Sequence, residues 1–465
     1  MFKRTRQIGW FLCALLLAAA IIAITGCNRS TPGTAAGAPS DGINIRGAKV
    51  ITMGWSNPYD ILTADPPEAE RDFAYYEYRK KLLTDNQLEI RTVVPDGGWD
   101  NYLPTVTSTI MSGDKTYSIY SLQADWAMTF LRQGLLFPLN ESSVKLDSRV
   151  PVLFETPPYN KMIEDMFTFN GKQYAYRPGL GGDSWQGNFL FWNKRLFREA
   201  GIEPDLPYDL QKAGTWTWDA FHDLARRLTR DVNNDGIIDY HGLPCDDPRE
   251  VMNAFIYGNN ANYVIIDSQG RFVNATTRPE FIEAMQFYLD LIEEGVMKPR
   301  PAGSAWDWDW TEFFDGRVGM YLAAEWRKSQ MPEMPDDYGS VMPPKGPRAT
   351  DYRMGTTESV WVVPNLFTKE EVDVILKVSQ LWSAPIDDDD WKQGQYWAYR
   401  DRRGVDETME MTRDPRRVTF RNYGLIPGFP QSEIIWDLWS FKGNPAQIVE
   451  SLVPRINALL DEMNN

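Results

Sequence analysis

The sequence predicts an α/β protein folded into two lobes, and three observations carry that prediction. Segments rich in β-branched residues alternate with segments of helical period, which is typical of mainly parallel sheets covered by helices. The folded part begins near Ile45 and holds about 420 residues, more than one hydrophobic core usually serves. The chain carries no internal repeat that would indicate a solenoid.

Local sequence patterns predict the positions of several strands and helices. Strands are predicted at residues 50–55 and 88–94, where β-branched and other apolar residues gather. Helices are predicted where a start signal precedes apolar residues spaced three and four apart. These start signals are Thr217, Pro279, the capping-box sequence Thr368–Glu371 and the pair Asn444–Pro445.

The first residues of the chain predict where the protein works. Three basic residues precede an apolar run from Ile8 to Ile24, and small residues then lead to Cys27. This order is typical of a secretory signal peptide. A membrane-spanning anchor is the alternative, because the run is close to the ~18 residues that a span needs.

The end of this segment, Ile-Thr-Gly-Cys at residues 24–27, resembles the lipobox of bacterial lipoproteins. The resemblance implies cleavage before Cys27 and lipidation of that cysteine. The next residues are rich in Gly, Ser, Thr, Ala and Pro, which predicts a flexible tether. We therefore expect a signal peptide at residues 1–26, a linker at residues 27–44, and a lipid-anchored protein on the extracellular or periplasmic face of the cell membrane.

The composition argues against several functions. The chain has 48 Lys and Arg and 64 Asp and Glu. Removal of the signal peptide takes away three of the basic residues, so the mature chain has 45 and a net charge of −19. Nucleic acids are bound by basic surfaces, so we expect no nucleic-acid partner. Cys245 alone would remain as a free cysteine, which excludes a disulfide within the mature domain. Only His222 and His241 are available for histidine-centred catalysis.

Aromatic residues favour a carbohydrate ligand. They form 13% of the chain and include 18 Trp, several of them beside Asp, Asn, Gly or Gln. In residues 306–310 three Trp alternate with two Asp, so an extended segment would place the three Trp on one side. A pyranose ring needs both an apolar surface on which to stack and polar groups for its hydroxyls. For any single Trp, a place in the core is the alternative.

Residues 231–239 predict a calcium loop. Oxygen donors occupy loop positions 1, 3, 5 and 9, a glycine occupies position 6, and position 7 would contribute its backbone carbonyl. The predicted ligands are Asp231, Asn233, Asp235, Ile237 and Asp239. Position 12 is Gly242 instead of the usual Glu, and a polar turn held by Asn and Asp side chains is the alternative. We expect one structural Ca²⁺ here and no other cofactor.

Six segments, in this order along the chain, resemble the extracellular solute-binding proteins of ABC importers that take up sugars and oligosaccharides. They are residues 170–174, 191–202, 217–221, 231–242, 314–320 and 342–347. The resemblance implies a periplasmic-binding-protein-like fold of two α/β lobes joined by a hinge, closing on an oligosaccharide that a membrane permease then receives. It implies a monomer without catalytic activity.

The resemblance also sets the expected lobes and contacts. We expect residues 45–160 and about 312–360 in the N-terminal lobe, and residues 161–311 and about 361–465 in the C-terminal lobe. Ligands bind at the carboxyl ends of strands in open α/β sheets, so aromatic and acidic residues after strands and in loops are the candidates. The predicted contacts are Trp55, Tyr59, Asp125, Trp126, Trp185, Trp308, Glu325 and Trp326.

Other functions stay open at this point. A surface lipoprotein that cleaves polysaccharide, as a glycosidase or a lyase, could use a pair of the many carboxylates. A sensory sugar-binding protein would report its ligand to a receptor. An arginine cluster near the end of the chain either balances local acids or meets an acidic sugar or an acidic permease surface. It consists of Arg400, Arg402, Arg403, Arg413, Arg416, Arg417 and Arg421.

Overall fold

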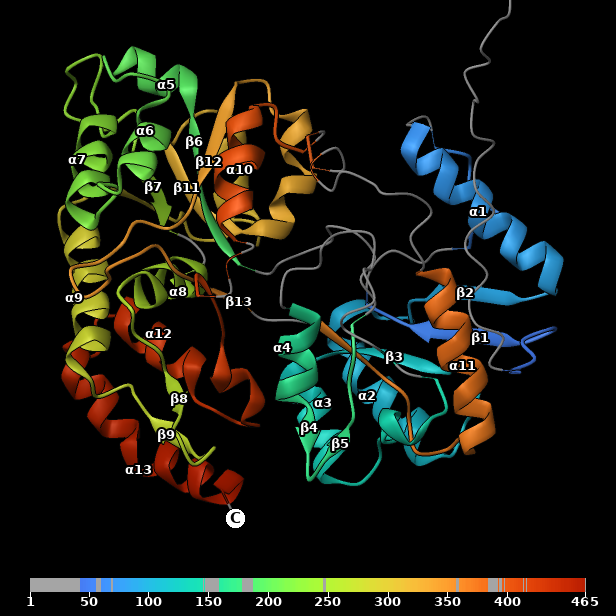
Figure 1. The fold of residues 1–465 in the computed structure, drawn as a ribbon. Coiled ribbons are helices and arrows are strands. Elements are labelled where there is room, and N and C mark those ends of the chain that lie inside the picture. The colour runs from blue at the N-terminus through green and yellow to red at the C-terminus, as the bar shows by residue number, and fades with distance from the viewer. Residues whose placement is uncertain are drawn as a thin grey trace, which may run out of the picture. The chain divides into compact units, whose positions relative to one another are not determined.

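Helices and short strands alternate along the chain in the computed structural model (Figure 1). The structure describes residues 42–464 except for 56–59, 68–69, 145, 147–158, 178–186, 246–247, 357–358, 384–391, 393–394, 397, 413 and 415. The residues from Ile43 onward group as one unit.

The first sheet combines three early strands with one strand from much later in the chain. Its order is β14-β3-β1-β2, with β1 parallel to β2 and β3, and β14 antiparallel to β3. The strands are β1 (Lys49–Met53), β2 (Glu89–Val93), β3 (Ile119–Gln123) and β14 (Ser359–Val362). The two strands predicted from local composition are confirmed as β1 and β2.

Helices connect and cover this sheet. They are α1 (Glu70–Asn86), α2 (Gly98–Met111), α3 (Ala124–Arg132) and α11 (Lys369–Trp382), and the chain continues through η1 (Leu139–Glu141), α4 (Tyr159–Met166) and the hairpin of β4 (Thr168–Phe169) and β5 (Lys172–Gln173). Val372 and Leu376 of α11 belong to the same buried cluster as Val50 of β1. The late helix therefore completes a core that the early strands begin.

The second sheet is built around β6. Its order is β11-β6-β12, and both outer strands run antiparallel to β6. The strands are β6 (Asn188–Asn193), β11 (Met320–Ala324) and β12 (Tyr338–Val341), and Figure 1 draws them side by side. All six residues of β6 are buried.

The remaining elements surround this second sheet or extend from it. The helices are α5 (Lys194–Glu199), α6 (Leu206–Ala213), α7 (Trp218–Leu228), α8 (Pro248–Gly258), α9 (Pro279–Glu293), α10 (Trp308–Phe314), α12 (Gln431–Trp439) and α13 (Pro445–Asn464). The paired strands are β7 (Leu243–Cys245) with β10 (Met297–Pro299), β8 (Val264–Ile266) with β9 (Phe272–Asn274), and β13 (Met354–Thr356) with β15 (Val418–Phe420). The short 3₁₀ helices are η2 (Glu325–Ser329), η3 (Met331–Glu333) and η5 (Asn422–Leu425), and η4 (Gly404–Met409) is a π helix.

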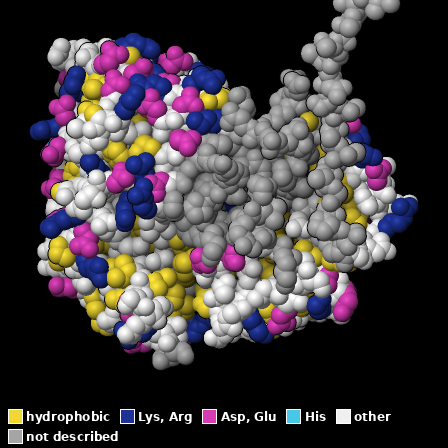
Figure 2. Space-filling model, in the orientation of Figure 1, with side chains coloured by type: hydrophobic (Ala, Val, Ile, Leu, Met, Phe, Trp, Pro, Cys, Tyr) yellow, Lys and Arg dark blue, Asp and Glu magenta, His cyan; other side chains and the backbone are white. Residues whose placement is uncertain are grey.

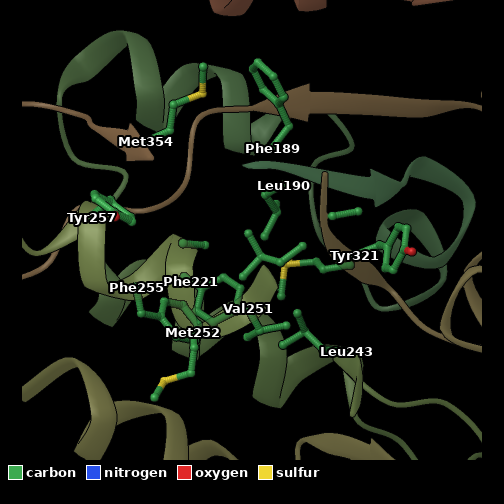
Figure 3. Close-up of a cluster of buried hydrophobic side chains, with 14 of the residues drawn as sticks. Phe189, Leu190, Phe221, Leu243, Val251, Met252, Phe255, Tyr257, Tyr321 and Met354 are labelled. Carbon is green, nitrogen blue, oxygen red and sulfur yellow. The ribbon is translucent and has the colours of Figure 1, made fainter. Parts of the chain in front are cut away.

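The core of this region is a large apolar cluster shared by β6, α7 and α8. Figure 3 shows Phe189 and Leu190 of β6 together with Phe221 of α7 and Met252 and Phe255 of α8. All five side chains are fully buried. Full burial of one such side chain contributes about 1.5–3 kcal/mol, so this cluster is a main source of stability.

The helices with start signals are confirmed. Thr217 caps α7, and its hydroxyl accepts a hydrogen bond from the amide of Ala220. The capping box before α11 is complete, because Thr368 and Glu371 each accept a hydrogen bond from the other's backbone amide. α9 and α13 begin at Pro279 and Pro445 as predicted.

The structure corrects two details of the predicted fold. The α/β class is confirmed, but the second sheet is antiparallel where we expected mainly parallel pairing. A strand buried on both faces is apolar throughout, and its composition does not encode the direction of its neighbours.

The strand pairings also differ from the predicted lobe boundaries. Residues 312–360, expected with the N-terminal lobe, supply β11 and β12 to the sheet of β6. Residues 361–465, expected with the C-terminal lobe, supply α11, which packs on β1, and part of β14. The chain thus returns to the first sheet later than expected, because long-range strand partners leave no local signal.

Asp373 of α11 provides a prediction about acid stability. Its carboxylate accepts hydrogen bonds from Ser142 Oγ at 2.6 Å, the Ser143 amide at 2.7 Å and Lys369 Nζ at 2.9 Å. Burial alone would raise the pKa of Asp373, but these hydrogen bonds outweigh burial and lower the pKa to about 2. A carboxyl whose pKa is lowered on folding stabilises the protein above its unfolded pKa, near 3.8. That contribution, about 2 kcal/mol, is lost as the pH falls toward 2.

The variant Asp373→Asn tests this prediction. We expect urea unfolding at pH 6 to show the loss of about 2 kcal/mol, and we expect the variant's stability to fall less steeply than that of the wild type between pH 4 and pH 2. Asp223→Asn, at a carboxyl that is 65% exposed, is the matched control and should change little. If stability falls equally steeply with pH in the wild type and in Asp373→Asn, Asp373 is not the source of the loss of stability in acid.

Candidate functional site

A cavity of about 630 Å³ is lined by residues from elements of both sheets. On the side of the first sheet these residues are Gln123, Ala124 and Asp125, where β3 ends and α3 begins, together with Ser359 of β14. The carboxyl end of a parallel strand is where ligands bind in open α/β sheets. The cavity therefore includes a strand end at which the sequence predicts a ligand contact, Asp125.

On the side of the second sheet the lining is rich in indole rings. Trp306 lies in the loop before α10, Trp326 lies in η2 directly after β11, and Trp436 belongs to α12. Trp306 is 71% exposed, and the other two are 39% exposed. Large apolar surfaces left uncovered in a concave site are typical of a place where a ligand packs.

A buried charged group also belongs to the cavity lining. Arg421 is almost fully buried, and its Nη2 donates a hydrogen bond to Asn188 Oδ1 at 2.5 Å and lies 3.2 Å from Glu250 Oε2. Asn188 also donates to the carboxylate of Glu250. Burial opposes the charge of Arg421, but the neighbouring Glu250 outweighs burial and raises the pKa of Arg421. Arg421 is therefore charged, and both partners are bound to protein groups.

The carboxyl groups of the lining differ in what they can do. Glu250 is paired with Arg421, and Asp309 accepts a hydrogen bond from the Tyr321 hydroxyl at 2.9 Å. Asp125 lies at the start of α3, and burial raises its pKa although backbone hydrogen bonds oppose the rise. A carboxyl group at this place can accept hydrogen bonds from ligand hydroxyls.

The predicted contacts fall into four groups in the structure. Asp125 and Trp326 line the cavity. Glu325 is fully buried next to Lys328, and Trp308 is buried at the start of α10, so neither side chain is in the lining. The segment at residues 306–310 is thus helical from Trp308 onward, and its three Trp do not share one side as an extended strand would place them. Tyr59 and Trp185 lie outside the described residues.

The other two predicted contacts, Trp55 and Trp126, belong to an aromatic cluster outside the cavity lining. Their ring centroids lie 6.1 Å apart, and Trp99 lies 5.6 Å from Trp55 and 5.0 Å from Trp126. Tyr102 completes the cluster, and its hydroxyl donates to the carbonyl oxygens of Met53 and Ser121. Trp55 and Trp126 follow β1 and β3, as predicted, and their role in ligand contact stays a prediction.

In the structure, the described arginines of the cluster all pair with acidic residues. Arg403 pairs with Glu407 at 2.9 Å and Asp209 at 3.0 Å, and Arg417 pairs with Asp351 at 2.9 Å. These arginines balance local acids, and so does Arg421, which lines the cavity and pairs with Glu250. Arg413 lies outside the described residues. On the face drawn in Figure 2, acidic and basic side chains are interspersed over the described part.

Several functional candidates were missed because no local pattern marks them. Glu250 and Arg327 are ordinary charged residues in the sequence, and only long-range packing brings them to the cavity. Trp306 belongs to the Trp-Asp segment at residues 306–310, from which the sequence predicts Trp308 as the contact. The prediction of Trp308 is wrong because α10 begins at this residue and its side chain is buried in the core.

The loop at residues 231–239 has the turn that a calcium loop needs. Gly236 has a φ of 86°, and its amide donates to Asp231 Oδ2 at 2.8 Å. The amides of Val232 and Asp235 donate to Asp239 Oδ2 and Asn233 Oδ1, both at 2.8 Å. Within the described residues no group of three or more His, Cys, Asp or Glu side chains is arranged to hold a metal ion. The polar-turn alternative accounts for these bonds, and calcium stays a prediction.

Chelation tests the calcium prediction. If Asp231, Asn233, Asp235 and Asp239 bind Ca²⁺, the melting midpoint will rise with calcium and fall with EGTA, because an ion that binds only the folded state stabilises it. The variant Asp235→Ala should remove the difference. An unchanged midpoint in wild type would leave the loop as a polar turn.

The sequence model of the bacterial extracellular solute-binding protein family matches residues 63–365, more than half of the chain. The chain belongs to this family. In the described part of the chain, no helix combines the length and apolar character needed to cross a membrane.

Sequence relatives and solved structures agree with the family. Binding proteins of Brucella abortus and Brucella suis are 24% identical over 290 residues, which is 61% of this chain and 62% of theirs. The chain thus matches less than two thirds of the length of these relatives.

Among solved structures, an ABC substrate-binding protein of Listeria monocytogenes in complex with cycloalternan is 17% identical in sequence. The structural alignment covers 89% of this chain and 99% of the Listeria chain, with a TM-score of 0.60. A cyclic α-maltosyl-1,6-maltose binding protein of Arthrobacter globiformis is 16% identical, with the same coverage and a TM-score of 0.59. These likenesses show a shared two-lobed fold.

Proposed function

We propose that this protein is the extracellular substrate-capture component of an ABC transporter and that it binds an oligosaccharide in the cavity. The observation that carries the proposal is the combination of exposed indoles with hydrogen-bonding groups in one concave site. Trp306, Trp326 and Trp436 provide surfaces for the apolar faces of sugar rings. Asp125 and Gln123 provide acceptors and donors for hydroxyls on the opposite side.

The similar structures support the same ligand class. Proteins of this fold have been solved with cycloalternan and, in Streptomyces glaucescens, with acarbose. Capture would follow from lobe closure, since a ligand favours the closed state only by binding it more tightly than the open state. The closed form would then be recognised by the membrane permease, and the captured sugar would leave chemically unchanged. A dissociation constant near micromolar, about −8 kcal/mol, suits capture followed by release.

We also propose that the mature chain is a monomer held at the membrane by acyl groups on Cys27. The lipobox-like residues 24–27 support the anchor, and the linker composition supports a tether. Mass spectrometry of the N-terminal peptide of the membrane-bound protein should find acyl groups on Cys27 and no residues 1–26. An unmodified Cys27 with residues 1–26 still attached would favour an uncleaved anchor instead.

A thermal-shift screen with reducing-end detection tests the proposed function. The panel should contain neutral and acidic oligosaccharides. A specific ligand at ~100 times its dissociation constant adds about 2.7 kcal/mol of stability, which raises the melting midpoint measurably. A shift without new reducing ends is the expected result. New reducing ends would favour a glycosidase, and no shift with any sugar would contradict the carbohydrate assignment.

A further inference from the structure

Arg327 occupies an unusual place for a charged side chain at a binding cavity. It lies in η2, directly after Trp326, and its side chain is only 5% exposed although it belongs to the cavity lining. A buried guanidinium needs partners that hold it in place, since an uncompensated buried charge is costly. The partners of Arg327 are aromatic rings, the side-chain amide of Gln330 and the carboxylate of Asp309.

Three indoles surround the guanidinium. The Cζ atom of Arg327 lies 4.3 Å from the ring centroid of Trp326, 5.1 Å from that of Trp306 and 6.0 Å from that of Trp310. All three distances are within the range of cation–π attraction, which strengthens as the cation loses contact with water. Trp310 is buried, whereas Trp306 and Trp326 keep exposed surface in the cavity.

Polar contacts fix the direction of the guanidinium. Arg327 Nη1 donates a hydrogen bond to Gln330 Oε1 at 2.9 Å, and Nη2 lies 3.7 Å from Asp309 Oδ1. Asp309 is itself fixed, because its carboxylate accepts hydrogen bonds from the Tyr321 hydroxyl and the Trp310 amide. The polar contacts of Arg327 are therefore made at the edge of its planar guanidinium group, and the two faces of the group remain available for stacking on aromatic rings.

Trp306 depends on this contact more than Trp326 does. Trp306 stands in the loop before α10 and is 71% exposed, so packing in the core does not hold it. Among the described residues, Arg327 is the cation that its ring contacts. One side chain thus couples a loop tryptophan to a tryptophan at the end of β11.

We propose that Arg327 is a positioning residue that holds the indoles of Trp306 and Trp326 at fixed places in the cavity wall, so that sugar rings stack on both. The proposal rests on the proposed carbohydrate function. It implies a ligand with at least two rings, because two separate indoles are prepared for stacking. Arg327 acts through the tryptophans, since little of its own side chain is open to the ligand.

The ligand-free protein gives the first test. The protein is labelled with 5-fluorotryptophan, and the ¹⁹F resonances of the two rings are assigned with the variants Trp306→Phe and Trp326→Phe. In Arg327→Gln we expect both resonances to shift and that of Trp306 to broaden, because its ring is released. Arg79→Gln is the matched control. Arg79 lies 5.0 Å from the ring of Trp382, outside the cavity lining, so this variant should leave the Trp306 and Trp326 resonances in place.

Sugar binding gives the second test, with maltotriose, cellotriose and mannotriose as probes in calorimetric titrations. For a probe that binds wild type, we expect Arg327→Gln to raise the dissociation constant about tenfold. Arg327→Lys should recover part of this loss, because it keeps the cation but loses the fork. Arg79→Gln should bind as wild type does.

The two tests separate failure of the inference from failure of the proposed function. Unchanged Trp306 and Trp326 resonances in Arg327→Gln would overturn the positioning role, whatever the sugars do. Equal affinity of wild type and Arg327→Gln for a bound probe would also overturn it. If none of the three sugars binds wild type, the proposed ligand class is contradicted, and the ligand-free spectra still decide whether Arg327 positions the rings.

Discussion

Replacing Arg421 by glutamine is expected to lower the free energy of unfolding by about 3 kcal/mol. Arg421 is almost fully buried and bound to Asn188 and Glu250, so its loss leaves the carboxylate of Glu250 without its cation. Breaking a buried pair in this way costs about 3–5 kcal/mol, and the partial exposure of Glu250 places the effect at the lower end. Urea unfolding followed by tryptophan fluorescence measures the change.

A matched control separates burial from charge. Arg416 also pairs with a carboxylate, Asp414, at 2.5 Å, but its side chain is 82% exposed. Arg416→Gln should therefore change the free energy of unfolding by less than about 0.5 kcal/mol. Equal effects of Arg416→Gln and Arg421→Gln would show that burial at the cavity does not set the cost.

Replacing Trp326 by alanine is expected to weaken oligosaccharide binding at least tenfold. Trp326 lines the cavity, keeps 39% of its surface exposed, and stacks on Arg327 on one face. Truncating a large aromatic anchor in a concave site typically removes about 2 kcal/mol of binding or more. Titration calorimetry with a sugar from the thermal-shift screen measures the loss.

The control for this variant is Phe441→Ala. Phe441 is also an exposed aromatic residue, at 55%, but it lies outside the cavity lining. The variant Phe441→Ala should therefore bind sugar with the same affinity as the wild type. If Phe441→Ala and Trp326→Ala weaken binding equally, the effect comes from a general loss of structure and the assignment of Trp326 is contradicted.

The parts of the fold that were predicted correctly are those with local causes. The capping box at Thr368–Glu371 and the N-cap Thr217 each satisfy free amides at a helix start, so the residues beside them encode the helix. The direction of β11 and β12 against β6 could not be predicted in this way. Their pairing depends on residues more than a hundred positions apart, and fully buried strands are apolar in either direction.

Closeness to a strand end explains the predicted site residues only in part. Asp125 and Trp326 each lie two residues beyond a strand and line the cavity, but Trp126 and Glu325 follow the same two strands and do not line it. Trp308 follows no strand, and its helix turns it inward. Arg421 and Glu250 meet across 171 positions of sequence, and only the folded chain shows that they form one group.

The most direct test of the account is a calorimetric titration of an oligosaccharide from the screen into wild type and into Asp125→Ala, with reducing ends measured after each run. Asp125 is the predicted carboxyl group that the structure places in the cavity lining. We expect one sugar per chain, affinity at least tenfold weaker in Asp125→Ala, and no new reducing ends. Equal affinity in the two proteins would place the sugar elsewhere, and cleavage would show that the protein is an enzyme.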